Sequence, residues 1–259
     1  MRIAMGVEYD GAPFSGWQRQ DHASTVQAQL ERALSRVADR PVAVVCAGRT
    51  DAGVHACGQV VHFDTDAQRA TRAWVLGANV QLPAAISVRW AQEVDDAFHA
   101  RFSATARRYR YVILNRWARS AMRHARVAWE HRPLAADRMA DAGRLLLGEH
   151  DFSAFRAAGC QARTAVREVR ELAVRRQGEL VVMEIEANAF LQHMVRNIAG
   201  TLMRVGRGEA DVDWVAQVLA AGDRRLAGVT APPDGLYFLG VRYPDAFALS
   251  DAMASACCQ

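Results

Sequence analysis

The residues best suited to chemistry lie close together in one short stretch, residues 47–56. Arg49, Thr50 and Asp51 bring a guanidinium, a hydroxyl and a carboxylate into three consecutive positions, and the imidazole of His55 follows. Two glycines, five residues apart within the stretch, would let the backbone turn tightly and approach a ligand closely. So many polar groups in a loop between two apolar runs indicate a site.

The same residues also allow two other interpretations. Asp51 could bond its own backbone in an Asx turn, with Arg49 simply paired to it. Asp51 and His55 could instead form the acid–base pair of a hydrolase, but such a site needs a further carboxylate or metal ligand, and the stretch offers neither. The five cysteines are scattered and form no Cys-x-x-Cys pair, so we expect no metal site.

Regular elements must hold this stretch in place, and the first part of the chain predicts a series of them. Ser24-Thr25-Val26-Gln27 has the spacing of a capping box, and the apolar residues after it form one helical stripe. The order strand, helix, strand, strand, helix, strand is typical of a ferredoxin-like or RNA-recognition unit, although another α+β sandwich of this length would also fit. The elements expected here are strands at 2–9, 41–46, 59–63 and 86–94 and helices at 26–37 and 68–80.

A second series of elements follows. A strand at 108–114 would place Arg108 and Arg110 on one side and Tyr109 and Tyr111 on the other. The tyrosines could face a cleft and stack on a base or could face the core, and we favour the core for Tyr111. Further along we expect helices at 133–147, 189–205 and 213–221, strands at 166–175, 179–187 and 235–241, and an irregular segment at 151–163. The domains expected are 1–104 and 105–244, followed by an alanine-rich, disordered tail at 245–259.

The charge of the chain is unevenly distributed. All 32 basic side chains are arginine, and the formal net charge is only +4. Between Phe98 and Arg132, however, nine arginines stand against one acid, Glu130. A solvated face could carry such a stretch, but unbalanced arginine beside aromatic residues favours a nucleic-acid backbone. No apolar run reaches the length of a membrane span and the chain starts without a signal peptide, so we expect a cytoplasmic protein with no membrane contact.

Four segments resemble the TruA family of tRNA pseudouridine synthases, and together they cover nearly the whole chain up to about Pro244. These are Ala47-Gly48-Arg49-Thr50-Asp51-Ala52-Gly53-Val54-His55-Ala56, the loop with Tyr9-Asp10-Gly11 and Gly16-Trp17-Gln18, the segment 98–111, and the segment 189–200. The resemblance implies an α+β fold of two ferredoxin-like or RRM-like halves whose antiparallel sheets join around a central cleft. It also implies a homodimer that isomerises uridine to pseudouridine at positions 38, 39 and 40 in the anticodon stem-loop of tRNA. No atoms enter or leave in that reaction and no electrons are transferred, so no cofactor is required.

The resemblance also assigns roles by position. Asp51 matches the catalytic aspartate, Tyr109 the tyrosine that packs on the target base and could assist proton transfer, and Arg196 the arginine that pairs with the aspartate. A neighbouring guanidinium would keep ionised a carboxylate that burial in a base pocket would otherwise neutralise. Leu236 matches the aliphatic lining of the uracil pocket, and Arg49 matches the side chain that fills the space of the flipped uridine. The RNA-contacting residues implied are Phe98, His99, Ala100, Arg101, Phe102, Arg107, Gly159, Cys160, Gln161, Ala162 and Arg163.

A non-catalytic RNA-binding protein made of two recognition-type units is the alternative to an enzyme. It would explain the arginine-rich segment and the predicted fold. It does not explain Asp51 at the centre of the most polar loop, because a carboxylate repels phosphate.

Overall fold

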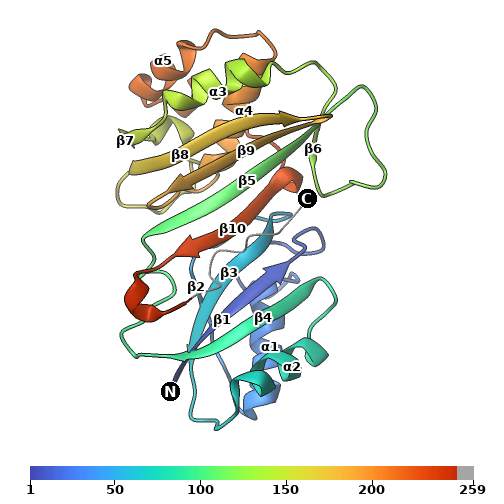
Figure 1. Cartoon of the computed structure of the whole chain (residues 1–259), viewed down its shortest axis with the longest axis vertical. Helices are drawn as coiled ribbons and strands as arrows, with labels where there is room; N and C mark the ends of the chain where they lie inside the picture. Colours follow the sequence, from blue (N-terminus) through green and yellow to red (C-terminus); the bar gives the residue numbers. More distant parts are fainter. Residues whose placement is uncertain (250–259) are drawn as a thin grey trace. The chain divides into compact units, whose positions relative to one another are not determined.

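The computed structural model describes residues 1–249, which form two compact units (Figure 1). Unit 1 consists of Met1–Arg107 together with the residues from Tyr237 onward, and unit 2 is Arg108–Leu236. Each unit combines paired strands with helices, so the α+β class expected from the sequence is confirmed.

Residues 237–249 belong to unit 1, whereas the expected second domain spanned 105–244. Strand β10 (Leu236–Arg242) runs parallel to strand β3 (His55–Asp64), with Tyr237 opposite His55. This pairing draws the last strand out of the second unit and places it beside the strand that follows the candidate loop.

The sheet of unit 1 has the strand order β4–β1–β3–β10, and the short strand β2 also pairs with β3. Strand β1 is antiparallel to both β3 and β4. The strands predicted at 2–9 and 86–94 are confirmed with the same bounds, whereas β3 starts four residues earlier than predicted. The bounds are Arg2–Tyr9 for β1, Val45–Cys46 for β2 and Ile86–Val94 for β4.

Residues 41–44 do not extend β2, so the strand predicted at 41–46 is wrong over most of its length. The backbone N–H groups of Val42 and Val44 donate to side chains of helix α1 (Val26–Ala38). Val42 N–H donates to Ser35 Oγ at 2.9 Å and Val44 N–H donates to Glu31 Oε1 at 3.1 Å. Because the helix satisfies these donors, the segment needs no partner strand.

Two helices pack against each other in unit 1, α1 and α2 (Thr71–Gln81) (Figure 1). The Thr25 side chain caps α1 by accepting a hydrogen bond from Ala28 N–H at 3.4 Å, one residue later than the predicted cap at Ser24. The apolar stripe of α1 is buried as predicted.

The sheet of unit 2 has the strand order β5–β9–β8–β7, and β6 runs parallel to β5. The predicted hairpin is confirmed: β8 and β9 are antiparallel, and Gly178 in their turn has φ 59°, a conformation that suits glycine. The strand bounds are Ala106–Asn115 for β5, Ala128–Glu130 for β6, Gly148–Asp151 for β7, Val166–Gln177 for β8 and Leu180–Ala187 for β9.

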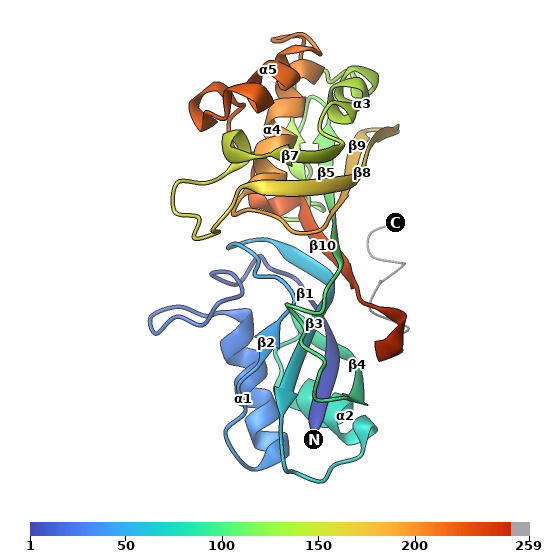
Figure 2. The same cartoon turned by 90° about the vertical axis from the view of Figure 1, so that its left-hand side faces the viewer.

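Three helices group together in unit 2 (Figure 2), and two of them are shorter than predicted. Helix α3 (Ala136–Arg144) ends early, and the chain then turns into β7. Helix α4 (Met194–Gly206) begins five residues late because His193 has φ 61°, outside the helical region. Helix α5 (Trp214–Ala221) lies within one residue of its prediction.

A close backbone approach joins α4 to the segment 228–231. A Cβ atom on Gly200 would lie 1.8 Å from the carbonyl oxygen of Val229, and one on Gly228 would lie 2.7 Å from the Gly200 backbone. Only glycine allows this contact at either position.

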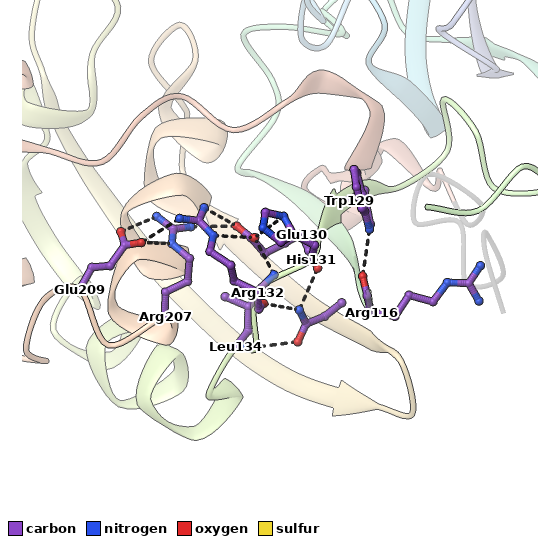
Figure 3. A network of polar contacts seen from close by, with 9 residues as sticks. Arg116, Trp129, Glu130, His131, Arg132, Leu134, Arg207 and Glu209 are labelled. Carbon is purple, nitrogen blue, oxygen red and sulfur yellow. Dashed lines mark hydrogen bonds and ion pairs between the residues drawn. The ribbon is translucent and has the colours of Figure 1, made fainter. Parts of the chain in front are cut away.

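A buried carboxylate ties β6 to the end of α4 (Figure 3). Glu130, only 5% exposed, receives hydrogen bonds from Arg132 at 3.0 Å and from Arg207 at 3.2 Å. Both arginines also bind Glu209. Each charge in this network therefore has an opposite partner, as a charge with little access to water requires.

The disorder predicted for residues 245–259 is wrong for the first residues of that segment. Asp245–Phe247 forms a 3-10 turn, and the Phe247 ring packs 5.2 Å from the ring of Phe98. Residues 250–259, which include Cys257 and Cys258, lie outside the described residues. Within residues 1–249, none of the helices is long and apolar enough to cross a membrane.

Candidate active site

The polar side chains of the loop 47–54 differ in their exposure to solvent. Arg49 is exposed, Asp51 is half-buried, and Thr50 between them is only 8% exposed. The loop turns back through Gly53, which has φ 78°, and Val54 N–H donates to the Asp51 carbonyl at 3.2 Å. Asp51 therefore stands on a tight turn, next to a residue that is fixed in the interior.

Three buried side chains hold this loop from the sheet side, and we call Tyr9, Thr50 and Gln59 the loop clamp. The hydroxyls of Tyr9 and Thr50 lie 2.8 Å apart. Gln59 Nε2 donates to the Gly48 carbonyl at 2.6 Å, and its Oε1 accepts from Gly48 N–H at 3.4 Å. Burial raises the pKa of Tyr9, so its hydroxyl stays neutral and the clamp carries no charge.

The loop predicted after β1, residues 10–20, contacts the other side of the loop 47–54. Trp17 N–H donates to the Thr50 carbonyl at 3.0 Å, and Gly53 N–H donates to the Phe14 carbonyl at 3.4 Å. Gly16 has φ 92°, and a Cβ there would lie 2.9 Å from the Thr50 carbonyl oxygen. The first two segments that resemble the TruA family are thus in direct contact.

His55 is buried beside the carboxylate of Asp10, whose Oδ1 lies 3.1 Å from His55 Nδ1. Its Nδ1 accepts a hydrogen bond from Gly11 N–H at 3.1 Å, and its ring stacks on Tyr237 with centroids 4.7 Å apart. The imidazole is 3% exposed.

The segment 98–102 divides into buried and exposed members. Phe98 and Ala100 are fully buried, whereas Arg101 and Phe102 are exposed. His99 Nδ1 accepts hydrogen bonds from the backbone N–H groups of Arg101 and Phe102 at 3.2 and 3.1 Å, and its ring stacks 4.4 Å from the Phe102 ring. A half-buried histidine thus shapes the turn that presents an arginine and a phenylalanine to solvent.

A second histidine stands behind this turn. His62 Nδ1 accepts from Ala100 N–H at 3.1 Å, and its ring centroid lies 4.7 Å from that of His99. Burial, and then the proximity of His99, lower the pKa of His62 to about 4. The neutral ring, which the hydrogen bond from Ala100 requires, is therefore stable at neutral pH.

Arg107 connects the segment 98–102 to the candidate loop. Its guanidinium donates to the carbonyls of Ala104 and Ala47, both at 3.2 Å, and to the carbonyl of Arg101. These contacts give Arg107 a positioning role that the sequence did not indicate.

Unit 2 contributes Tyr109 and Leu236, which are both buried. Tyr109 lies on β5, and its ring meets the edge of Phe190 with centroids 5.0 Å apart. Its neighbours Arg108 and Arg110 bind the carboxylate of Glu184, at 2.6 and 2.7 Å. With Arg116 on Glu179 and Arg132 on Glu130, at least four of the nine arginines in the arginine-rich segment are paired with acids within the protein.

Arg196 lies half-buried in the first turn of α4, where its own backbone is fixed. Its Nε donates to the Ala231 carbonyl at 2.8 Å, and Ala231 N–H donates to the Arg196 carbonyl at 3.1 Å. The next residue, Asn197, is buried, and its Oδ1 accepts from Arg224 and Thr230 at 3.0 and 2.7 Å. We call Asn197, Arg224 and Thr230 the helix clamp, since they hold the segment 224–231 against the start of α4.

The remaining candidates lie in the segment 159–163 of unit 2. Gly159, Gln161 and Arg163 are exposed, whereas Cys160 and Ala162 are half-buried. Arg156 shapes this turn by donating to the carbonyls of Cys160 and Ala162. The sequence contained no signal for that role of Arg156, nor for the roles of Tyr9 and Gln59 in the loop clamp.

Within residues 1–249, no three His, Cys, Asp or Glu side chains gather in a way that could hold a metal ion. Unit 1 offers a carboxylate on a fixed turn. Unit 2, taken by itself, offers a buried tyrosine and a fixed arginine. A carboxylate of this kind can attack a carbon atom or transfer a proton, and an arginine can bind an anion.

Comparisons with known proteins give a consistent result. A family model described as tRNA pseudouridine synthase matches residues 5–103 and 142–244. The chain is 59% identical to the tRNA pseudouridine synthase A of Methylococcus capsulatus, with 96% of this chain and 92% of that protein covered. It is 59% identical to that of Aeromonas hydrophila (94% and 91% covered) and 58% identical to that of Nitrosococcus oceani (96% and 96% covered). Among solved structures, one in a crystal structure of a Cbf5-Nop10-Gar1 complex aligns with a TM-score of 0.41 at 9% identity, over 91% of this chain and 48% of that chain.

Proposed function

Because the chain belongs to the tRNA pseudouridine synthase family, we propose that Asp51 is the catalytic carboxylate of this enzyme. We also propose that the enzyme acts on the uridines at positions 38, 39 and 40 of the anticodon stem-loop. It is an isomerase that converts uridine to pseudouridine in tRNA. These two assignments, Asp51 and tRNA positions 38–40, are supported by the resemblance of the loop 47–56 to the signature loop of the family.

The reaction fixes what the residues have to do. The bond from ribose C1′ to uracil N1 breaks, the base turns, and C1′ bonds to C5. C5 then loses its proton and N1 gains one, so the atoms balance within the substrate. A carboxylate must engage the sugar or the base while the first bond breaks, and a base must accept the C5 proton.

The loop clamp is the observation that carries the assignment of Asp51. It holds the backbone of Gly48 and the side chain of Thr50 with buried hydrogen bonds, while Asp51 itself keeps access to solvent. A fixed backbone beneath an accessible carboxylate lowers the reorganisation needed to reach the reactive geometry.

We assign the residues of unit 2 by the same resemblance. Tyr109 would pack on the target uracil and could assist removal of the C5 proton, and Leu236 would line the base pocket. Arg196 would pair with Asp51 and keep the carboxylate ionised. The contacts of Arg196 with Ala231 support this role, since they fix the side chain close to its head group.

A uridine in a stem has to leave the base stack before it can react, at a cost of a few kcal/mol. Arg49, which is exposed, would occupy the space that the uridine leaves. The exposed residues Arg101, Phe102 and Arg163 would contact the RNA backbone or stack on bases. For Phe98, Ala100 and Arg107, burial or internal bonds favour an indirect role in holding that surface.

The proposal also includes the finer features that the resemblance implies. These are a homodimer in the cytoplasm and two ferredoxin-like halves. The strand order β4–β1–β3 of unit 1, with β2 beside β3, supports the ferredoxin-like description of that half.

Tritium release tests the central assignment. With tRNA transcribed from 5-tritiated uridine, the wild type should release tritium, and Asp51→Asn should lower the rate by at least 1000-fold while binding tRNA with unchanged affinity. Mapping the modified nucleotides would test positions 38–40. An Asp51→Asn variant that still turned over would refute the catalytic role, and a wild type that bound tRNA without releasing tritium would favour the RNA-binding alternative.

A further inference from the structure

A long connection in unit 2, residues 116–127, joins β5 to β6 (Figure 1). It exposes unusually large side chains. Trp117 is 84% exposed and Met122 is 90% exposed, and Trp129 in the middle of β6 is 45% exposed. A tryptophan so far out of the core loses most of the free energy that its burial would contribute. Such a cluster marks a surface that contacts another molecule.

The same connection is strongly basic. Residues 116–129 contain four arginines, one histidine and no acidic residue. Arg116 is engaged within the protein, since it donates to the Ala118 carbonyl at 2.8 Å and to Glu179 at 3.0 Å. Arg119 and Arg123 are exposed, and each has its position set by the turns of the connection.

The connection is held at both ends, so the exposed side chains are presented on a fixed base (Figure 3). Asn115, the last residue of β5, donates to the carbonyls of Glu130 and Arg132 at 2.9 and 2.7 Å. Trp129 Nε1 donates to the Arg116 carbonyl at 3.0 Å, which joins the first residue of the connection to the strand that follows it. The buried Glu130 network then anchors that strand to the end of α4.

We propose that this arginine–tryptophan surface, made of Trp117, Arg119, Met122, Arg123 and Trp129, is a second docking site for tRNA, away from the reacting nucleotide. Exposed arginines neutralise phosphates, and an exposed indole stacks on an unpaired base whatever its sequence. The connection carries four arginines and no acid, so its charge complements the phosphates of RNA.

The distance along β5 separates this site from the chemistry. The strand runs six residues from Tyr109 to Asn115, about 20 Å at a rise of about 3.3 Å per residue. A nucleotide on Tyr109 therefore does not reach Trp117, and the surface would bind another part of the RNA. This reasoning uses the role of Tyr109 in the proposed function.

Because the two sites are separate, changes in the arginine–tryptophan surface should weaken tRNA binding without changing the rate of the chemical step. Trp117→Ala should raise the dissociation constant for full-length tRNA about tenfold. The double variant Arg119→Gln/Arg123→Gln should raise it by a similar factor at physiological salt and lower the slope of log affinity against log salt by about 1.5. Single-turnover rates at saturating enzyme should equal that of the wild type for both variants.

Matched changes on helix α2 of unit 1 serve as controls. Leu76→Ala removes another exposed apolar side chain, and Arg72→Gln removes another exposed arginine. Neither should change the affinity for tRNA. Tritium mapping of the modified positions is carried out on the same variants, so a failure of the assignment to positions 38–40 would be seen separately from a change in affinity.

Three results would overturn the inference. One is an unchanged dissociation constant in both surface variants, and another is a single-turnover rate that falls while affinity stays the same. The third is a lower association state of Trp117→Ala in sedimentation velocity without RNA, which would make the surface a contact between copies of this chain.

Discussion

The loop that carries Asp51 and the helix that carries Arg196 are fixed by different physical means. In unit 1 the loop clamp works through neutral side chains that reach from the sheet to the loop. In unit 2 the first half of α4 is fixed by backbone contact at Gly200 and Gly228 and by the helix clamp, which includes a half-buried guanidinium. Side-chain contacts can be removed singly with the fold intact, whereas a backbone contact allows no added atom.

This difference means that changes in the two regions should have different consequences. A defect in the loop clamp should lower the rate of the reaction with little change in folding. A defect in the contact between α4 and the segment 228–231 should lower the free energy of unfolding first. The predictions below test that contrast, beginning with the largest effect.

Gly200→Ala should lower the free energy of unfolding by about 3 kcal/mol or more, because the added Cβ would overlap the Val229 carbonyl oxygen. Urea denaturation followed by circular dichroism measures the change. Gly77→Ala in α2 is the matched control: its Cβ would meet only a methyl of Val37, at 2.9 Å, and alanine raises helix propensity by about 1 kcal/mol. Equal losses in the two variants would remove the distinction between backbone and side-chain contacts.

Thr50→Val should lower the single-turnover rate about tenfold, because the loop clamp loses the bond to Tyr9 and the turn beneath Asp51 loosens. The affinity for tRNA should not change. Thr50→Ser keeps the hydroxyl and should restore most of the rate. Tyr9→Phe should resemble Thr50→Val, and the two changes together should cost little more than either alone, since both remove the same hydrogen bond. Additive losses would mean that the hydroxyls act separately.

A smaller effect, on stability at low pH, is expected from His62. Unlike the side chains of the loop clamp, this histidine can become charged. Its pKa of about 4 in the folded protein lies below the ordinary value near 6.5, so the unfolded chain binds the proton more readily. Neutral His62 therefore makes its full contribution to the free energy of unfolding above about pH 6.5, and this contribution is lost as pH falls toward 4. His62→Asn keeps an acceptor for Ala100 N–H but does not titrate, so its melting temperature should fall less than that of the wild type between pH 7 and pH 5.

His124→Asn, at an exposed position, is the control for this measurement and should follow the wild-type profile. If the profiles of wild type and His62→Asn coincided, the acid sensitivity of unit 1 would have another origin.

Periodicity in the sequence predicted most elements, because hydrophobic patterns are local. The strands at 2–9 and 86–94 and the hairpin of β8 and β9 were predicted correctly on that basis. The strand at 41–46 failed because its backbone donors are satisfied by side chains of α1, which no local pattern reveals. The start of α4 was predicted too early because the left-handed residue there is a histidine rather than a glycine.

The candidate loop was found from its residue types together with its resemblance to the TruA family, but the groups that support the loop were not found. Tyr9 and Gln59 stand 50 residues apart in the sequence, and their contact exists only once β1 and β3 are paired. Likewise, Arg108 and Arg110 gave the same signal in the sequence as Arg119 and Arg123. Only the fold brings Glu184, more than 70 residues away, against the first pair.

The pairing of β10 with β3 has a consequence for the timing of synthesis. His55, directly after the loop that carries Asp51, stacks on Tyr237, about 180 residues later in the chain. At roughly 5–20 residues per second, a ribosome needs about 10–35 s to cover that distance. During this interval the nascent unit 1 is without β10, so the loop reaches its final environment only after that strand has been synthesised.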